Sequence, residues 1–214
     1  MAMPTESNFL TLVQWLSPSF PTGAFAYSHG LETAILEGWI TDPESLEHWL
    51  RDCLVQGSGR SDAIWLRLAY GSDDIAELDR TARAFAISHE RKREAERQGK
   101  AFVKVVNSVW GMDLPDLILP VAFGRAAGAA GLDKDQTVAH YLQAFVSNLV
   151  AASLRLCPIG QTPGQAVAMA LHADILRVTE QTKGATEADV YGSAFVSDIA
   201  AMRHETQQPR LFQS

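Results

Sequence analysis

Hydrophobic residues recur along most of this chain at the three-to-four-residue spacing of an α-helix. The pattern is clearest between residues 43 and 56. The apolar positions of this segment all fall on one helical face: Leu46, Trp49, Leu50, Cys53 and Leu54. Asp42 can accept from the free N–H groups at the start, and Pro43 suits the first helical position. The pattern therefore predicts an amphipathic helix over 43–56.

A longer segment, 133–156, repeats the pattern. Asp133 and Gln136 resemble a capping box at its start. Its apolar stripe consists of Val138, Tyr141, Leu142, Phe145, Leu149, Ala152 and Leu156. Pro158 and Gly160 end the helix, because neither residue continues one easily.

The same periodicity predicts further helices along the chain. They cover 7–16, 27–38, 61–70, 74–86, 88–109, 116–130 and 164–181. Alternation of period two, which is typical of strands, is nearly absent. We therefore predict an all-α protein of about eight to ten helices, in a single domain over 1–214. Residues 183–214 form an irregular connector, to residue 196, and a C-terminal tail.

Composition and charge narrow the function classes. Hydrophobic residues make up 47% of the 214, enough for a sizeable core. The net charge of −7 argues against binding to nucleic acid or to an anionic membrane surface, since both need clustered Lys and Arg. No apolar run approaches the roughly 20 residues that span a bilayer. The two cysteines, Cys53 and Cys157, lie far apart, which favours a reduced, cytoplasmic protein.

Motifs that carry catalysis are missing from the sequence. It contains no phosphate-binding G-x-x-x-x-G-K-[ST], no G-x-S-x-G and no H-E-x-x-H. None of the six histidines is paired with a Cys or His at metal-ligand spacing. We therefore expect a protein that is not an enzyme and that binds no cofactor or metal tightly. The charged segment 88–98 favours a solvated helix face over a partner-binding patch.

Three irregular segments stand out between the helices. In 15–32, two prolines and a glycine precede Tyr27, Ser28 and His29 at a helix N-terminus. This turn can bind an acidic group of a partner or simply pack within the protein. In 157–165, a Thr-Pro-Gly-Gln sequence makes a helix corner.

The third irregular segment is the C-terminal tail, 197–214. It carries Arg203, His204, Glu205 and Arg210, followed by Leu211 and Phe212. Arginine beside an aromatic anchor is typical of an interface hot spot. The alternative is that Leu211 and Phe212 fold back onto the core of the same chain.

Together the three segments resemble the family of the urease accessory protein UreF. The first is similar to S-P-x-x-P-x-G-x-F-x-Y-S-x-G-L-E and the second to P-[IL]-G-Q-T-x-G-Q. The tail is similar to D-I-A-x-M-x-H-E-T-Q-x-x-R-L-F-x-S. The segments occur in the family's order, with an R-x-E-x-x-x-Q-G-like stretch near 93–99 between them. Thr22, Ala24 and Gln208-Pro209 depart from the usual residues.

The resemblance implies a non-catalytic scaffold in urease maturation. Such proteins dimerise, bind UreD (also called UreH) and the GTPase UreG, and handle nickel within a complex that delivers it to the urease apoprotein. The implied UreD-type contacts are Arg203, His204, Glu205, Thr206, Gln207, Arg210, Leu211 and Phe212. The implied UreG-type contacts are Tyr27, Ser28, His29 and Glu32. For the homodimer, the helix over 138–156 is the candidate.

Two other functions remain open at this point. Arg203 or Arg210 could complete the active site of UreG, which would make the chain a GTPase-activating or regulatory factor. Direct nickel carriage is disfavoured, because His29, His204 and the two cysteines do not cluster in sequence. Under the scaffold hypothesis, removal of 203–214 is expected to abolish UreD binding and to leave the fold intact.

Overall fold

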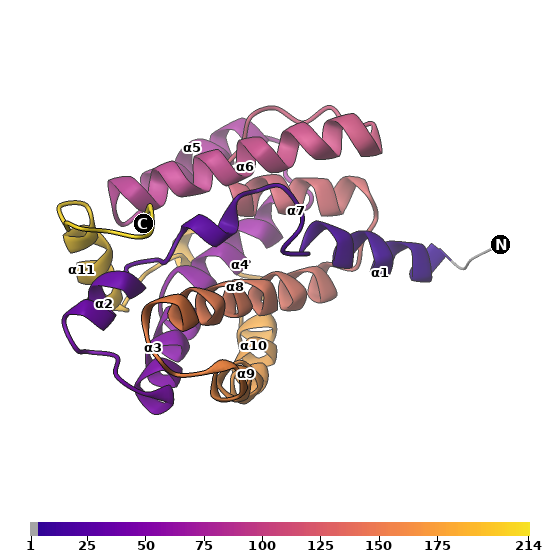
Figure 1. Ribbon diagram of the computed structural model, residues 1–214. Helices are drawn as coiled ribbons and strands as arrows, with labels where there is room; N and C mark the ends of the chain where they lie inside the picture. The colour runs from indigo at the N-terminus through magenta and orange to yellow at the C-terminus, as the bar shows by residue number, and fades with distance from the viewer. Residues whose placement is uncertain (1–3) are drawn as a thin grey trace.

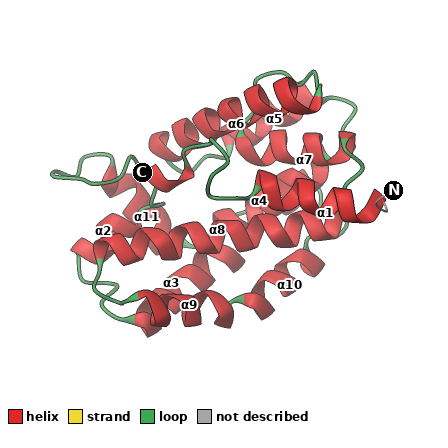
Figure 2. Ribbon diagram, turned by 45° about the vertical axis from the view of Figure 1, so that its right-hand side comes forward, coloured by secondary structure: helices red, strands yellow, loops and turns green. Residues whose placement is uncertain are grey.

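The computed structural model describes residues 4–214, whose helices pack around one continuous hydrophobic core (Figure 1). The α-helices are α1 (Pro4–Trp15), α2 (Leu31–Leu36), α3 (Pro43–Val55), α4 (Ser58–Ala69), α5 (Ile75–Ala84), α6 (His89–Trp110), α7 (Leu119–Ala129), α8 (Lys134–Leu156), α9 (Gln161–Ala170), α10 (His172–Gln181) and α11 (Phe195–His204). Two 3-10 helices, η1 (Ala24–Ala26) and η2 (Glu187–Asp189), lie in the connections. These residues contain no strand (Figure 2).

Helix α7 lies between α4 and α6, and glycines allow both close approaches. A Cβ atom on Gly124 of α7 would stand 2.2 Å from the carbonyl oxygen of Leu66 in α4. A Cβ atom on Gly99 of α6 would stand 2.1 Å from that of Leu117, just before α7. Only a residue without a side chain fits at these two positions. The upper part of the molecule in Figure 1 is therefore a tight stack of helices.

Aromatic side chains join α1 to this stack. The ring of Trp15, at the end of α1, meets Phe102 of α6 edge-on at 5.4 Å and Phe123 of α7 at 5.7 Å between centroids. All three side chains are buried. Pairs of this kind contribute about 0.5–1.5 kcal/mol beyond the area they bury. They fix the start of segment 15–32, which leads into the candidate site.

The structure confirms the all-α prediction and corrects three details of it. The predicted helix 164–181 is two helices that meet at the buried Leu171. The predicted helix 27–38 begins only at Leu31, because His29 and Gly30 have positive φ angles of 57° and 78°. Much of the tail is helical, as α11, which raises the number of α-helices in residues 4–214 to eleven. None of these helices is long and apolar enough to cross a membrane.

Candidate functional site

The end of the chain folds back along segment 27–32. The Ser28 N–H donates to the main-chain oxygen of Ser214 at 2.7 Å, and the Gln213 N–H donates to the Ala26 oxygen at 2.8 Å. Figure 1 shows the C-terminus beside α2, α11 and the start of α6. The two segments that the sequence singled out separately thus form one surface, which we call the tail site.

Glu32 of α2 is the main anchor of the tail. Its carboxylate accepts from the N–H of Leu211 at 2.6 Å and from the N–H of Phe212 at 2.8 Å. The side chain is largely buried, so these bonds form in a medium where water competes weakly. A charged acceptor satisfies two main-chain donors that would otherwise be left unpaired.

His204 joins three helices at the centre of the tail site. Its ring is fully buried, with Nδ1 2.7 Å from Glu90 of α6 and Nε2 3.2 Å from Glu32 of α2. The guanidinium of Arg210 donates to the other oxygen of Glu90 at 2.5 Å. Glu90 therefore holds both the end of α11 and the tail that follows it.

Glu205 caps the start of α6. Its carboxylate accepts from the N–H of His89 at 2.7 Å and from the N–H of Glu90 at 3.2 Å. The first N–H groups of a helix have no partner inside it and carry a partial positive charge. The tail thus satisfies the first N–H groups of α6 as well as packing against this helix.

A second buried carboxylate, Glu94, lies one turn further along α6. It accepts from the Ser214 hydroxyl at 2.6 Å and pairs with Arg91 and His29, the latter at 2.8 Å. Burial, the largest single influence, opposes its ionisation, but Arg91 and His29 together outweigh burial and lower the pKa of Glu94 to about 2. Burial, followed by the nearby Arg91 charge, lowers the pKa of His29. The Nε2 atom of His29 faces Glu94, and its Nδ1 has no hydrogen-bond partner.

A close contact between backbones sets α11 against α2. A Cβ atom on Gly30 would stand 2.6 Å from the main-chain nitrogen of Ala201. The positive φ of Gly30 is also a conformation that glycine adopts without strain. His29 is the one other residue than glycine with a positive φ in the described chain.

The Leu211–Phe212 pair folds back onto the core in part. Phe212 is 2% exposed, joins the core, and lies under the guanidinium carbon of Arg155 at 4.5 Å from its ring centroid. Leu211 is 57% exposed and faces outward. Phe212 therefore anchors the tail, while the preceding Leu211 leaves its side chain exposed.

The predicted site residues likewise divide into those with exposed and those with buried or partly buried side chains. Those that expose their side chains are Arg203, Glu205, Thr206, Arg210 and Leu211. Those that are buried or partly buried are Tyr27, Ser28, His29, Glu32, His204, Gln207 and Phe212. Gln207 accepts from the Thr33 hydroxyl at 2.7 Å, which ties the tail to α2 once more. Most predicted UreG-type residues thus lie beneath the tail in this conformation.

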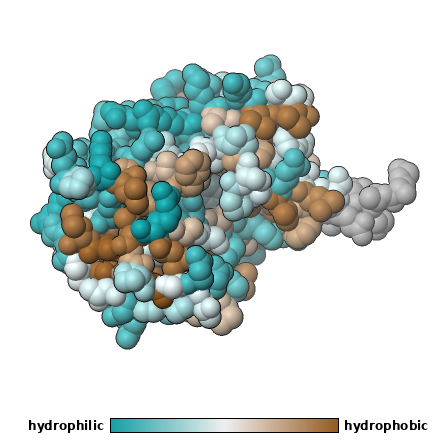
Figure 3. Space-filling model, viewed as in Figure 1, coloured by the Kyte–Doolittle hydropathy of each residue, from teal (hydrophilic) through white to brown (hydrophobic). Residues whose placement is uncertain are grey.

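The sequence analysis missed an exposed apolar face beside the tail site. Its members on α11 are Phe195, Ile199 and Met202, which recur at helical spacing. Leu36, at the end of α2, and Trp39, three residues beyond it, are also exposed, and α2 packs against α11. We call these five residues the α11 face. Figure 3 shows hydrophobic residues gathered where Figure 1 places α2 and α11. The spacing of the α11 members was the signal that could have revealed it.

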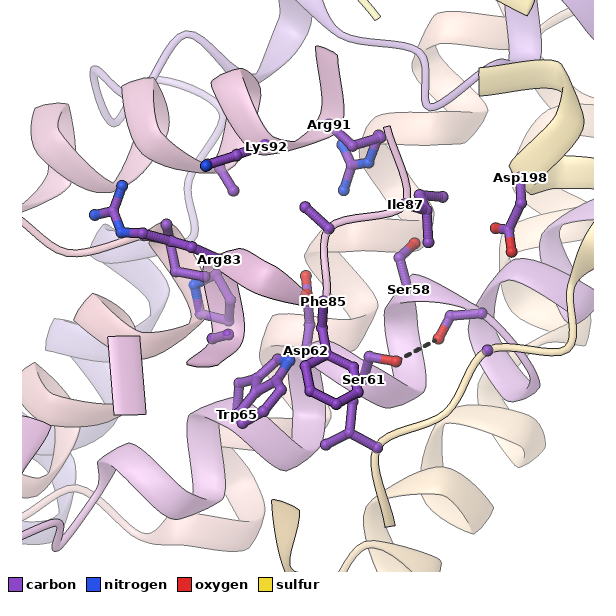
Figure 4. Close-up of a pocket in the computed structure, with 18 of the residues that line it drawn as sticks. Ser58, Ser61, Asp62, Trp65, Arg83, Phe85, Ile87, Arg91, Lys92 and Asp198 are labelled. Atoms are coloured by element: carbon purple, nitrogen blue, oxygen red, sulfur yellow. Dashed lines mark hydrogen bonds between the residues drawn. The ribbon is translucent and has the colours of Figure 1, made fainter. Parts of the chain in front are cut away.

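A hollow of about 100 Å³ lies between α4, the start of α6 and the connector before α11 (Figure 4). Trp65, Phe85 and Arg91 are among its lining residues. Burial raises the pKa of Asp62, which also lines it, to about 6, and Tyr141 donates to this carboxylate at 2.9 Å. Within residues 4–214, no group of three His, Cys, Asp or Glu side chains is placed to hold a metal ion.

Comparison with known proteins identifies close relatives. The sequence profile of the UreF family matches residues 40–172. A urease accessory protein UreF of Roseobacter denitrificans is 49% identical over 214 residues, which cover 99% of this chain and 96% of that protein. UreF of Cereibacter sphaeroides is 50% identical over 210 residues, 98% of this chain and 100% of its own. UreF of Ruegeria pomeroyi is 43% identical over the whole of both chains.

Proposed function

The chain belongs to the UreF family of urease accessory proteins, and from this premise we propose that it is a non-catalytic scaffold of urease maturation. It brings UreD (UreH) and the GTPase UreG together while nickel is inserted into the urease apoprotein. Nickel is cargo of the whole complex in this proposal, and the scaffold acts in the cytoplasm as a homodimer. The partly exposed side of α8 remains the candidate dimer surface.

The observation that carries this proposal is the α11 face beside the docked tail. Phe195 and Ile199 are 69% and 45% exposed, and Leu36 is 69% exposed. Large apolar side chains gathered on a surface and rimmed by polar groups are characteristic of protein–protein contacts. Arg203 and Arg210 supply such a rim, so this surface fits the docking of a protein such as UreD.

The predicted contact residues take two different roles under this proposal. Arg203, Arg210 and Leu211 are exposed and touch the partner directly. His204 and Phe212 are buried and act by holding the tail in its docked conformation. For the UreG-type set, we propose the same indirect role, since Glu32 binds the tail through two main-chain N–H groups.

Charge placed on the α11 face tests the proposal. Ile199→Glu is expected to remove UreD from a co-purified complex, because a carboxylate would be desolvated at the contact. The free variant should unfold at the same urea concentration as the parent, because Ile199 is already 45% exposed. Val109→Glu is the matched control, since Val109 is 64% exposed but lies on α6, away from this face.

Complex masses from light scattering give the result. Loss of UreD with Ile199→Glu and its retention with Val109→Glu would support the docking surface. Retention of UreD by both variants would refute this placement. If the parent chain bound neither UreD nor UreG, the scaffold role itself would fail.

The alternative, activation of the UreG GTPase by an arginine, finds no support in the contacts. Arg210 is paired with Glu90, and Arg203 donates to Glu37 at 3.0 Å while lying over the ring of Trp39. An activating arginine must leave such partners to reach the nucleotide. GTP turnover by UreG with and without the chain decides this point, since stimulation that Arg203→Ala abolishes would favour the alternative.

A further inference from the structure

Helix α6 carries a row of cations along its outer side. Six of the 18 Lys and Arg residues of the chain lie on this one helix. Four of them share a face, because they follow one another in steps of four, three and four residues: Arg93, Arg97, Lys100 and Lys104. All four are exposed, and they extend over about 16 Å of the helix axis. We call them the basic stripe.

The carboxylates of α6 do not neutralise this stripe. Glu90 and Glu94 are buried and hold the tail. Glu96 pairs with Arg83 of α5 at 2.7 Å. In the described part of the chain, the one ion pair on the stripe joins Lys100 and Asp116 at 3.2 Å, and both side chains are well exposed. Asp116 offsets one of the four cations, and the other three form no ion pair within residues 4–214, so the stripe keeps a net positive charge.

The basic stripe is continuous with the tail site. Arg97 donates from its guanidinium to the side-chain oxygen of Gln213 at 2.8 Å. Glu205 caps the first turn of the same helix. Figure 1 shows α6 running along the top edge of the molecule, and Figure 3 shows that edge to be hydrophilic except for a hydrophobic patch at its right-hand end. A molecule that covers the tail can therefore extend along the stripe.

We propose that the basic stripe binds an acidic helix of a protein partner, with carboxylates repeated at the same spacing. The net charge of −7 repels a polyanion such as nucleic acid or an anionic membrane at long range. A single acidic helix presents few charges, and three helical turns match the length of the stripe. The neighbouring α11 face, which is apolar, also suits a protein. This inference does not depend on which partners the proposed function names.

Fluorescence anisotropy with the full chain tests the proposal. The probe is a labelled helix-forming peptide with glutamates at positions i, i+4, i+7 and i+11, and its control is a shuffled peptide of the same composition. The patterned peptide should bind more tightly and weaken as salt rises. Combining Arg93→Glu, Lys100→Glu and Lys104→Glu should reduce its affinity by about tenfold or more. Arg97 is left unchanged because it contacts the tail.

A second triple variant controls for net charge. Arg80→Glu, Arg177→Glu and Lys183→Glu change the charge equally, at exposed positions outside α6. Its affinity for the patterned peptide should stay within about twofold of the parent. Circular dichroism and urea unfolding verify the fold, and glutamine replaces glutamate if the stripe variant unfolds.

Three results would overturn the proposal. The first is an equal loss of affinity in both triple variants. The second is equal binding, or no binding, of the patterned and shuffled peptides. The third is tighter binding of a short DNA duplex or of vesicles containing phosphatidylserine than of the patterned peptide.

Discussion

The pKa values of the carboxylates inside this protein differ according to their partners. Glu94 is buried, and Asp62 is partly buried where it lines the hollow beside α4. Glu94 pairs with Arg91 and has a pKa of about 2, so it stays ionised and can accept from Ser214. Asp62 is held by one hydroxyl, that of Tyr141, and its pKa rises to about 6. Glu94 therefore binds the end of the tail, and Asp62 makes the free energy of unfolding depend on pH.

Asp62→Asn is expected to stabilise the protein increasingly as pH rises from 4 to 7. The folded-state pKa of about 6 lies above the ordinary value of 3.8, so the folded chain holds this proton to higher pH than the unfolded chain. Ionisation of Asp62 therefore lowers the free energy of unfolding between these two values, by up to about 3 kcal/mol. Asparagine cannot ionise and still accepts from Tyr141.

Urea unfolding at several pH values measures this difference. Asp73→Asn, at an exposed position, is the control and should follow the parent across the range. A difference between Asp62→Asn and the parent that does not change with pH would contradict the expectation.

At the scale of elements, the tail site depends on how closely α11 approaches α2. The contact runs through Gly30, where the two backbones nearly touch. A short helix such as α2 has little stability of its own and needs this packing. The position of α11 therefore depends on this backbone contact as well as on side-chain burial.

Gly30→Ala is expected to loosen α11 and the tail. The added methyl group meets the main-chain nitrogen of Ala201, and the positive φ adds strain of about 1–2 kcal/mol. Gly38→Ala separates the two causes, because Gly38 has a φ of 73° but no atom near its Cβ position. Hydrogen exchange of residues 200–214 should increase in Gly30→Ala and stay near the parent level in Gly38→Ala. Equal exchange in both variants would show that the close approach is unimportant.

At the scale of the whole molecule, the tail connects the end of the chain to its first third. One main-chain hydrogen bond joins Ser28 to Ser214 and another joins Gln213 to Ala26, and Phe212 belongs to the common core. The sequence suggested that residues 203–214 could be removed without harm to the fold. The burial of His204 and Phe212 argues for the opposite expectation.

A chain that ends at Met202 is therefore expected to be less stable than the full chain. Loss of a buried phenylalanine alone costs about 3–5 kcal/mol, and Glu32 and Glu90 would be left without their partners. Urea unfolding should show a lower midpoint, and exchange of α2 should increase. Leu211→Ala, at an exposed position, should leave the midpoint unchanged. An equal midpoint for the shortened and full chains would show that the tail does not support the fold.

Local signals in the sequence were enough to predict the bounds of the helices that have strong caps. The predicted helices 43–56 and 133–156 lie within one residue of α3 and α8, since Asp42 and Asp133 accept from the N–H groups that start them. The family also followed from short ordered motifs. These features depend on neighbours a few residues apart, so the sequence alone was enough.

Only the tertiary structure decided how the candidate site is assembled. The turn at Leu171 leaves the apolar spacing unbroken, which is why periodicity missed it. The pairing of Glu32 with Leu211, and of Glu90 with Arg210, joins residues more than a hundred positions apart. Whether an apolar residue such as Phe212 is buried or exposed depends on what packs over it, because burial is a property of the assembled fold.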